Sequence, residues 1–414
     1  MAVLRLIRLA PSREAMCADG SGPAYYLKEG DSDVILVWLE GGGDCGTKDV
    51  CDERFQRQYR MSSLHLSPLK VLDGIFSDST SNVFARATRI YVPYCSSDSW
   101  LGRNLQPVYG YYFQGAAILS RIVEALEPQL LSARLAVFGG CSAGGRGAFY
   151  NLDRLCGLLP NRSTRCRGLL DAAWWVPDGP AADGLGRLVE GARAGVQSWG
   201  AELGECGRQQ GNNSYMCMFG PVWAPYVSTP YLMHEEQFDD FQLWKRGVAR
   251  PVFTWLPHAW QIAVALSHQL RASLAVIADS EGRSARVGPV VFSGTCTEHC
   301  LAESAGYWRV KVHGRSMEEL ARDWLEDGFA SSLIERCWMP NCSSGCPFEP
   351  LLYQVLLAIA AFLLIVTCTC CLCWRSYSHW RAQRACRVRR PHPGAYANLW
   401  QVIGARDPSD SNSG

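Results

Sequence analysis

The chain carries little charge for its length and almost no net charge. Lysine, arginine, aspartate and glutamate make up 19% of its 414 residues, and the formal net charge at pH 7 is +1. Without an excess of positive charge the composition does not favour a nucleic-acid-binding protein. The hydrophobic fraction of 48% is sufficient for a full core. The length suits one large α/β domain with additional segments.

Two ligand-binding patterns are also missing from the N-terminal part of the chain. The apolar run Val34–Leu39 ends in three glycines, but no lysine follows in the G-x-x-x-x-G-K order that cradles a phosphate. The cysteines between residues 17 and 346 supply no paired C-x-x-C spacing of the kind that holds structural zinc. We therefore expect no phosphate loop and no structural zinc site.

Cysteine, in contrast, is abundant. Fourteen of the 19 cysteines lie between Cys17 and Cys346. So many thiols have little structural use in a reducing cytosol, whereas outside the cell they form disulfides that hold loops together. The sequons that begin at Asn161, Asn212 and Asn341 agree with an extracellular or luminal compartment.

One stretch of the chain has no charge at all. Residues 351–374 contain no charged side chain and are long enough for the roughly 20 residues that a bilayer-spanning helix needs. Six arginines between Arg375 and Arg390 follow, and the positive-inside rule then places the basic tail 375–414 in the cytosol. We expect a single-pass membrane protein with an extracellular or luminal, disulfide-bonded ectodomain at residues 17–347.

The two ends of the chain lack the composition of folded segments. Arg5 and Arg8 interrupt the apolar character of residues 1–16. These residues are interpreted as a poor signal segment, or as one whose true start lies upstream. The tail 375–414 ends in RDPSDSNSG and is expected to be disordered.

The most informative motif lies in the stretch AVFGGCSAGGRGAFY, residues 136–150. Its centre is the G-x-S-x-G sequence from Gly140 to Gly144, which follows an apolar strand-like run and precedes a segment able to begin a helix. This is the context of the nucleophile elbow of an α/β-hydrolase, where glycines permit a strained turn and close packing of strand and helix. Ser142 is the candidate nucleophile, and the alternative is an ordinary serine in a glycine-rich turn.

The glycines after residue 39 have an interpretation in the same fold. In an α/β-hydrolase the loop after an early strand supplies backbone N–H groups to the oxyanion hole. Gly42, Gly43 and the amide of Ala143 are the candidate donors. Strand-like runs alternate with an amphipathic segment at residues 114–126, which predicts a mostly parallel sheet flanked by helices. Cys45 and Cys51 flank a short loop and predict a local disulfide.

Six blocks occur in a fixed order across residues 17–346. They are CADGSGPAYYLKEG, LEGGGDC, YVPYCSSDSWLG, GGCSAGGRGAF, CRGLLDAAWW and CWMPNCSSGCP. In order and approximate spacing they resemble the Notum and pectin acetylesterase family of α/β-hydrolases. The resemblance implies a serine carboxylesterase whose substrate is an acylated extracellular protein or an acetylated glycan.

The resemblance also indicates the other two members of a Ser-His-Asp triad. The segment TPYLMHEEQFDDFQL matches the family's acid-bearing pattern with Asp239 in the acid position, and Asp240 is the alternate. His299, in SGTCTEHCLAE, matches the family's histidine after a cysteine, and the chain order Ser, Asp, His is that of α/β-hydrolases. The predicted mechanism is two-step acyl transfer by these side chains and water, so we expect no metal and no organic cofactor.

Other interpretations of these residues remain open. Asp239 also fits a surface carboxylate in an acidic patch. A register with His258 in the acid position is rejected, because an imidazole cannot be the anionic partner of imidazolium. His299 could alternatively join nearby cysteines in a zinc site; those cysteines are Cys296, Cys300, Cys337, Cys342 and Cys346. The remaining histidines of this part are assigned surface or core roles; they are His65, His234, His268 and His313.

Asp44 departs from both branches of the family. Notum-like members carry bulky aromatic residues after the glycines of LEGG, and pectin acetylesterases carry a tryptophan before the cysteine. A carboxylate here forms neither an apolar acyl wall nor a stacking platform for sugar. Trp174, Trp175 and Trp223 are alternative lining residues. Asp44 also motivates a second hypothesis, a catalytically inactive hydrolase-fold ectodomain that acts as a ligand-binding or receptor-like membrane protein.

Overall fold

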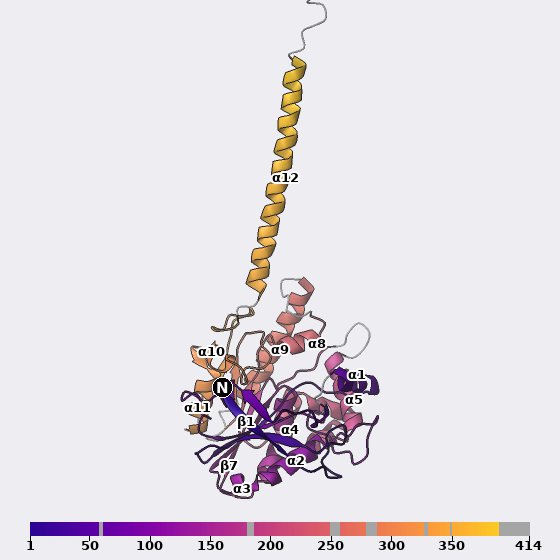
Figure 1. Ribbon diagram of the computed structural model, residues 1–414, viewed down its shortest axis with the longest axis vertical. Helices are drawn as coiled ribbons and strands as arrows, with labels where there is room; N and C mark the ends of the chain where they lie inside the picture. The colour runs from indigo at the N-terminus through magenta and orange to yellow at the C-terminus, as the bar shows by residue number, and fades with distance from the viewer. Residues whose placement is uncertain are drawn as a thin grey trace, which may run out of the picture. The chain divides into compact units, whose positions relative to one another are not determined.

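The computed structural model divides the chain into two units, Met1–Pro347 and Phe348–Gly414. It describes residues 1–57, 61–179, 186–248, 257–278, 288–326, 330–347 and 350–388. In the first unit, strands and helices alternate along most of the chain (Figure 1). This alternation is the α/β organisation that the sequence predicts.

A ten-stranded sheet runs through the first unit. Its strands are β1 (Ala2–Arg8), β2 (Ala24–Lys28), β3 (Val34–Leu39), β4 (Leu69–Leu72), β5 (Thr88–Val92), β6 (Leu135–Cys141), β7 (Arg165–Asp171), β8 (Tyr231–His234), β9 (Val290–Ser293) and β12 (Leu333–Ile334). Their order is β12-β9-β8-β7-β6-β3-β5-β2-β1-β4. Neighbours from β12 to β5 are parallel, and β2, β1 and β4 add antiparallel strands at one edge. A short hairpin of β10 (Lys311–Val312) and β11 (Arg315–Ser316) stands apart from this sheet.

The predicted signal segment, residues 1–16, contains the strand β1. It pairs antiparallel with β2 on one side and with β4 on the other. Ala2 and Leu4 are buried whereas Val3 and Arg5 are exposed, so the side chains alternate with the period of a half-buried strand. The signal interpretation is therefore wrong for these residues. The arginines that interrupt the apolar run belong to the solvent face of a strand.

Helices cover both faces of the sheet. They are α1 (Lys48–Arg57), α2 (Gly115–Ala125), α3 (Glu127–Leu131), α4 (Ala143–Gly157), α5 (Arg187–Trp199), α6 (Gly204–Gln210), α7 (Gly220–Trp223), α8 (Asp240–Lys245), α9 (Pro257–Ala278), α10 (Gly306–Arg309) and α11 (Met317–Glu326), with 3-10 turns η2 (Gly74–Phe76), η3 (Gly211–Met218) and η4 (Ala224–Tyr226). The predicted helix at residues 114–126 corresponds to α2, and the run Val34–Leu39 is the strand β3.

The strand β3 shows how the two faces are separated. Ile35, Val37 and Leu39 belong to a core with α2, α3, α4 and α9. Leu36 and Trp38 belong to a second core with α10 and α11. Because alternate side chains of a strand point to opposite faces, a continuous apolar run is required where both faces are covered. A third cluster packs α5, α6 and η3 beside the loop that follows β3.

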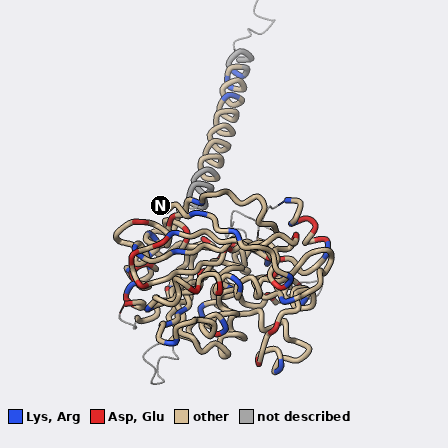
Figure 2. The backbone as a smooth tube through the Cα atoms, turned by 60° about the horizontal axis from the view of Figure 1, so that its bottom comes forward, with Lys and Arg blue, Asp and Glu red and all other residues tan. Residues whose placement is uncertain are grey.

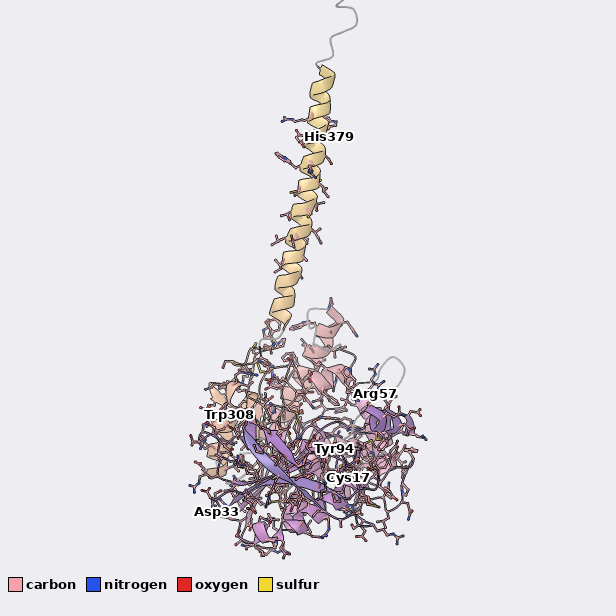
Figure 3. The ribbon with its side chains drawn as sticks, viewed as in Figure 1. Cys17, Asp33, Arg57, Tyr94, Trp308 and His379 are labelled. Atoms are coloured by element: carbon pink, nitrogen blue, oxygen red, sulfur yellow. A yellow bond between two sulfur atoms is a disulfide. The ribbon has the colours of Figure 1, made fainter. Side chains whose placement is uncertain are left out.

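Seven disulfides hold the first unit together. They join Cys17–Cys95, Cys45–Cys51, Cys141–Cys300, Cys156–Cys166, Cys206–Cys217, Cys296–Cys346 and Cys337–Cys342. The predicted local disulfide of the loop after β3 is confirmed. Cys17 is bonded to Cys95, and Figure 3 shows Cys17 beside Tyr94, the residue that precedes Cys95. Cross-links of this number are typical of an extracellular domain.

The second unit contains one long helix, α12 (Pro350–Val388). Among the described residues, one helix is long and apolar enough to cross a membrane, with its span at Ala358–Ala382 and a mean hydropathy of 2.0. The predicted span 351–374 overlaps it, but residues 375–388 continue the helix and correct the prediction of a disordered tail there. Residues 389–414 lie outside the described residues. Basic residues of α12 lie toward its C-terminal end, whereas charges of both signs are mixed over the first unit (Figure 2).

Candidate active site

Ser142 lies in a sharp turn between β6 and α4. Its backbone has φ 58° and ψ −123°, a conformation that non-glycine residues rarely adopt. The flanking glycines are required by close packing. A Cβ on Gly144 would lie 2.0 Å from the carbonyl oxygen of Leu39, and a Cβ on Gly140 would lie 2.5 Å from the Gly144 backbone. The turn therefore has the strained geometry of a nucleophile elbow.

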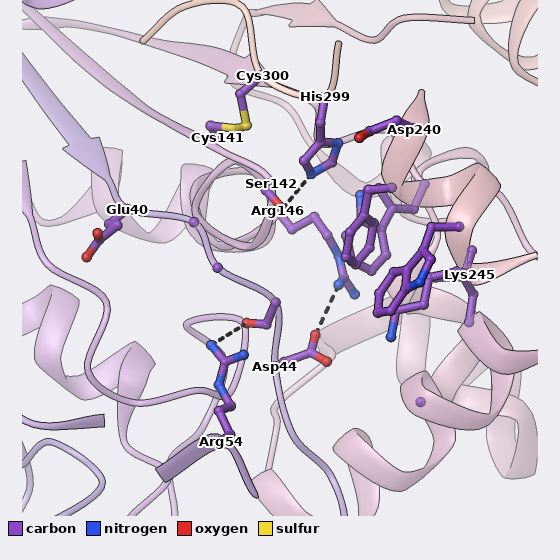
Figure 4. A pocket seen from close by; sticks show the side chains of 18 of the residues that line it. Glu40, Asp44, Arg54, Cys141, Ser142, Arg146, Asp240, Lys245, His299 and Cys300 are labelled. Atoms are coloured by element: carbon purple, nitrogen blue, oxygen red, sulfur yellow. Dashed lines mark hydrogen bonds and ion pairs between the residues drawn. A yellow bond between two sulfur atoms is a disulfide. The ribbon is translucent and has the colours of Figure 1, made fainter. Parts of the chain in front are cut away.

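His299 lies between Ser142 and Asp239. Its Nε2 is 2.8 Å from Ser142 Oγ (Figure 4). Its Nδ1 is hydrogen-bonded to Asp239 Oδ2. Ser142 follows β6, Asp239 lies in the segment after β8, and His299 lies in the loop after β9. Since carboxyl ends of parallel strands meet at one edge of a sheet, the topology brings together the three residues that the sequence selects.

The acid and the base are each fixed by further contacts. Asp239 is completely buried and caps the N-terminus of α8, where its Oδ1 accepts the Gln242 N–H at 2.6 Å. This cap leaves Oδ2 for the histidine. The ring of Phe241 stacks on the His299 imidazole with the centroids 5.0 Å apart. Both contacts restrict the plane and position of the imidazole.

The environment of His299 raises its pKa above 6.5. Burial alone would lower this pKa, because it disfavours the charged imidazolium. The charge of Asp239 and its hydrogen bond outweigh burial, and Asp240 and Asp171 act in the same direction. Asp240, the alternate acid, therefore contributes to the field at His299, while Asp239 holds the imidazole nitrogen.

The cysteines near His299 are engaged in disulfides. Cys300 is bonded to Cys141, Cys296 to Cys346, and Cys337 to Cys342. The alternative zinc site from these cysteines and His299 is therefore not formed, because their sulfurs are not thiolates. The side chains of Asp239, Asp240 and His299 also lie close enough to share an ion, but His299 uses both ring nitrogens in contacts with Ser142 and Asp239.

The glycine loop after β3 passes directly beside the serine. A Cβ on Gly41 would lie 3.0 Å from Ser142 Cβ, and Gly42 and Gly43 have φ angles of 140° and 73°. Only glycine adopts such angles readily, so the backbone can approach the serine here without side chains between them. Gly41, Gly42 and Gly43 line the same pocket as Ser142. Their use as oxyanion donors, with Ala143, stays a prediction.

A pocket of about 650 Å³ opens at Ser142. One wall is aromatic and consists of Trp175, Phe219, Phe241 and Trp244. Of the three tryptophans considered from the sequence, Trp175 lines the pocket. Trp174 is buried in the core and donates to Ser273, and Trp223 packs against Tyr150.

A charged wall adjoins the aromatic one. Asp44 Oδ2 accepts a hydrogen bond from Arg146 at 3.2 Å (Figure 4). It also accepts the Ser99 hydroxyl at 2.7 Å. The Arg146 guanidinium lies over the Trp175 ring, 3.8 Å from its centroid, and the side chain is 2% exposed. No motif in the sequence identifies Arg146, which lies in the first turns of α4, four residues after Ser142.

Glu303 is a second pocket residue that the sequence analysis missed. Burial raises its pKa to about 7, although the indole N–H of Trp38 donates to it at 2.6 Å and opposes the shift. Neighbouring Asp171 and Glu40 raise this pKa further. No motif in the sequence identifies this residue, since its environment comes from strands that are distant in the chain.

The profile of the Pectinacetylesterase family matches residues 1–347. The chain belongs to this family. It is 29% identical over 374 residues to the palmitoleoyl-protein carboxylesterase NOTUM of Homo sapiens. The aligned region covers 82% of this chain and 73% of that relative. The chain is 26% identical over 359 residues to the palmitoleoyl-protein carboxylesterase notum2 of Xenopus laevis, with coverages of 80% and 72%.

A solved structure agrees with this family assignment. The Wnt deacylase Notum from Drosophila superposes with a TM-score of 0.74 at 28% identity, covering 84% of this chain and 100% of the other. The predicted α/β-hydrolase fold and the predicted resemblance are therefore confirmed. Membership of the pectinacetylesterase family supports a carboxylesterase that hydrolyses acyl esters.

Proposed function

We propose that the protein is a serine carboxylesterase that hydrolyses O-acyl esters on an extracellular protein or glycan through Ser142, His299 and Asp239. The observation that carries this proposal is the position of His299, 2.8 Å from the serine oxygen and hydrogen-bonded to a buried carboxylate. A base within hydrogen-bond reach of a nucleophile, and itself oriented by an acid, is the arrangement that activates a serine.

The proposed reaction has two steps. Ser142 Oγ attacks the ester carbonyl carbon while His299 Nε2 takes the hydroxyl proton, and that proton then goes to the departing alcohol. The developing oxyanion receives hydrogen bonds from the amides of Gly42, Gly43 and Ala143. Water, deprotonated by His299, then attacks the acyl carbon; the bond to Ser142 Oγ breaks, the carboxylic acid leaves, and the imidazolium returns its proton to Ser142 Oγ. Each step uses side chains, amides and water.

The charged wall of the pocket favours a short acyl group. The Arg146–Asp44 ion pair lies in the pocket that contains the nucleophile. Within this pair the Asp44 side chain is still 22% exposed, and a long apolar chain laid against it would remove water from the carboxylate without replacing the lost hydrogen bonds, which is unfavourable. Acetyl and similar groups avoid this contact. The vertebrate relatives are palmitoleoyl-protein carboxylesterases, whose acyl group is long and apolar, unlike the short group proposed here.

We also propose that the first unit is extracellular or luminal and that the chain is anchored by α12. The seven disulfides and the sequons support an oxidising compartment for residues 1–347. The arginines near the C-terminal end of α12 support a cytosolic C-terminus by the positive-inside rule. A substrate would then be an acylated protein or an acetylated glycan on the outer side of the membrane.

The test compares p-nitrophenyl acetate and p-nitrophenyl octanoate as substrates of the full-length protein in detergent. We expect hydrolysis that is lost in Ser142→Ala, with kcat/KM higher for acetate, and labelling of Ser142 by a fluorophosphonate probe. Equal hydrolysis by wild type and Ser142→Ala would refute the assignment. Absence of both hydrolysis and labelling in the wild type would favour the inactive, ligand-binding ectodomain instead.

A further inference from the structure

Three charged side chains outside the triad are completely buried near the loop that carries His299. They are Asp171 at the end of β7, His234 at the end of β8, and Glu236 two residues later, each with an exposed fraction of 0%. His234 Nδ1 is 2.5 Å from Asp171 Oδ1, and its Nε2 is 3.3 Å from Glu236 Oε1. We call these three residues the buried charge cluster. The proposed reaction does not use them.

The hydrogen bonds of the cluster indicate that His234 is an imidazolium. Both of its ring nitrogens face carboxylate oxygens, and an ionised carboxylate only accepts hydrogen bonds, so each nitrogen has to donate. Burial alone would lower the pKa of His234, but Asp171 and Glu236 outweigh burial and raise it to about 10. The cluster thus holds a cation between two anions, joined by charge-assisted hydrogen bonds.

Both carboxylates also hold the backbone of the loop 294–302. Glu236 Oε2 accepts the Cys296 N–H at 2.7 Å, on one side of the catalytic histidine. Asp171 accepts the Ala302 N–H at 2.8 Å and the Leu301 N–H at 3.3 Å, on the other side. The loop is therefore attached to the cluster both before and after the residue that contacts the serine.

The backbone of Asp171 also contacts the serine. The carbonyl of Asp171 accepts the Ser142 N–H at 2.9 Å, and Asp171 lies in register with Cys141 on β6. His234 lies in register with Asp171 on the next strand. The strands that carry the nucleophile, the acid segment and the base loop thus meet at this cluster.

We propose that His234 is a positioning residue, whose imidazolium joins Asp171 to Glu236 so that both carboxylates keep the His299 loop within hydrogen-bond reach of Ser142. The proposal rests on the proposed esterase function. Removing the cation leaves two buried carboxylates without their shared partner, which is strongly unfavourable. The loop amides are then no longer held in place, and a 1 Å displacement of a catalytic group can lower a rate by about 100-fold.

The experiment measures p-nitrophenyl acetate hydrolysis by full-length wild type, His234→Gln, His268→Gln and Ser142→Ala. His268 is exposed on α9, so His268→Gln is the matched histidine control. We expect His234→Gln to lower kcat by at least about ten-fold with KM changed by less than about two-fold, because ground-state binding is retained. His268→Gln should resemble wild type. The circular dichroism spectrum identifies the folded variants.

A second substitution tests whether the loss of kcat in His234→Gln comes from the unpaired carboxylates or from general destabilisation of the fold. In His234→Gln/Glu236→Gln one of the two unpaired carboxylates becomes an amide, so we expect kcat to recover above that of folded His234→Gln. Failure of the double variant to recover would overturn the role of the cation. If His234→Gln does not fold, Glu236→Ala, which removes the acceptor of the Cys296 N–H, takes its place, and an unchanged kcat in it would overturn the proposal.

The outcomes also separate this inference from the proposed function. Hydrolysis that depends on Ser142 but is unchanged in folded His234→Gln overturns the positioning role and leaves the esterase assignment intact. Wild type that does not hydrolyse the ester, or that does so equally as Ser142→Ala, overturns both.

Discussion

Cys141 and Cys300 are joined by a disulfide, and each is the chain neighbour of a residue of the proposed triad. Cys141 precedes Ser142 at the end of β6, and Cys300 follows His299 in the loop after β9 (Figure 4). The two residues that share the proposed proton transfer are therefore linked covalently through their neighbours, although they are distant in the sequence. This link restricts how far the base can move from the nucleophile.

The disulfide should affect turnover more than binding. We expect Cys141→Ala/Cys300→Ala to lower kcat by about ten-fold or more, because the His299 loop then moves more freely. Removing a native disulfide also lowers the free energy of unfolding by roughly 2–5 kcal/mol. The matched control is Cys156→Ala/Cys166→Ala, which removes a disulfide at the start of β7. Equal loss of kcat in both variants would show that the effect is general destabilisation.

The pH dependence should report the raised pKa of His299. The imidazole acts as a base only when neutral, so kcat/KM should increase with pH, with a midpoint above the ordinary value of 6.5. Asp239→Asn removes the charge that raises this pKa, so the midpoint should move to lower pH. The rate should also fall, by about 10⁴ if the effect matches that of the equivalent change in serine proteases. An unchanged profile in Asp239→Asn would contradict the role of Asp239.

The Arg146–Asp44 pair should determine the preferred acyl length. In Arg146→Met/Asp44→Asn both charges are removed together, which avoids leaving one of them buried without a partner. We expect the ratio of kcat/KM for octanoate over acetate esters to rise by about ten-fold, since pocket changes of this kind commonly alter selectivity 10–200-fold. Arg193→Met, at an exposed arginine that lies over Tyr215, is the control. An unchanged ratio of kcat/KM for octanoate over acetate would show that the Arg146–Asp44 pair does not contact the acyl group.

Glycosylation can test the proposed orientation. Asn212 is exposed and begins a sequon, so in mammalian cells it should carry a glycan if the first unit is luminal. Glycosidase treatment should increase the gel mobility of wild type, and Asn212→Gln should shift mobility in the same direction. Asn213→Gln, next to it but outside a sequon, should not. A chain whose mobility is insensitive to glycosidase would argue against a luminal first unit.

The sequence predicted those parts of the site that depend on local geometry or on a family pattern. The nucleophile elbow is local, because a strained turn with close packing on both sides requires glycines around Ser142. Asp239 and His299 could be selected because the family pattern marks their segments. In the structure all three lie in hydrogen-bond contact, while their catalytic roles stay a prediction.

The errors and omissions of the sequence analysis have a common cause. The sequence alone favours a signal segment at residues 1–16, because the two strands that pair with β1, which are β2 and β4, are distant from it in the chain. Arg146 and Glu303 carried no motif, because what makes them part of the pocket is a partner on another element.

The sequence by itself determined the fold class, the family and the candidate nucleophile, since these follow from hydrophobic runs, glycine spacing and ordered motifs. Only the tertiary structure decided that His234 is held between Asp171 and Glu236, and that Cys141 is bonded to Cys300. The physical reason is that the charge state of a buried group and the partner of a cysteine depend on neighbours across adjacent strands. Those neighbours are set by the order and register of the sheet.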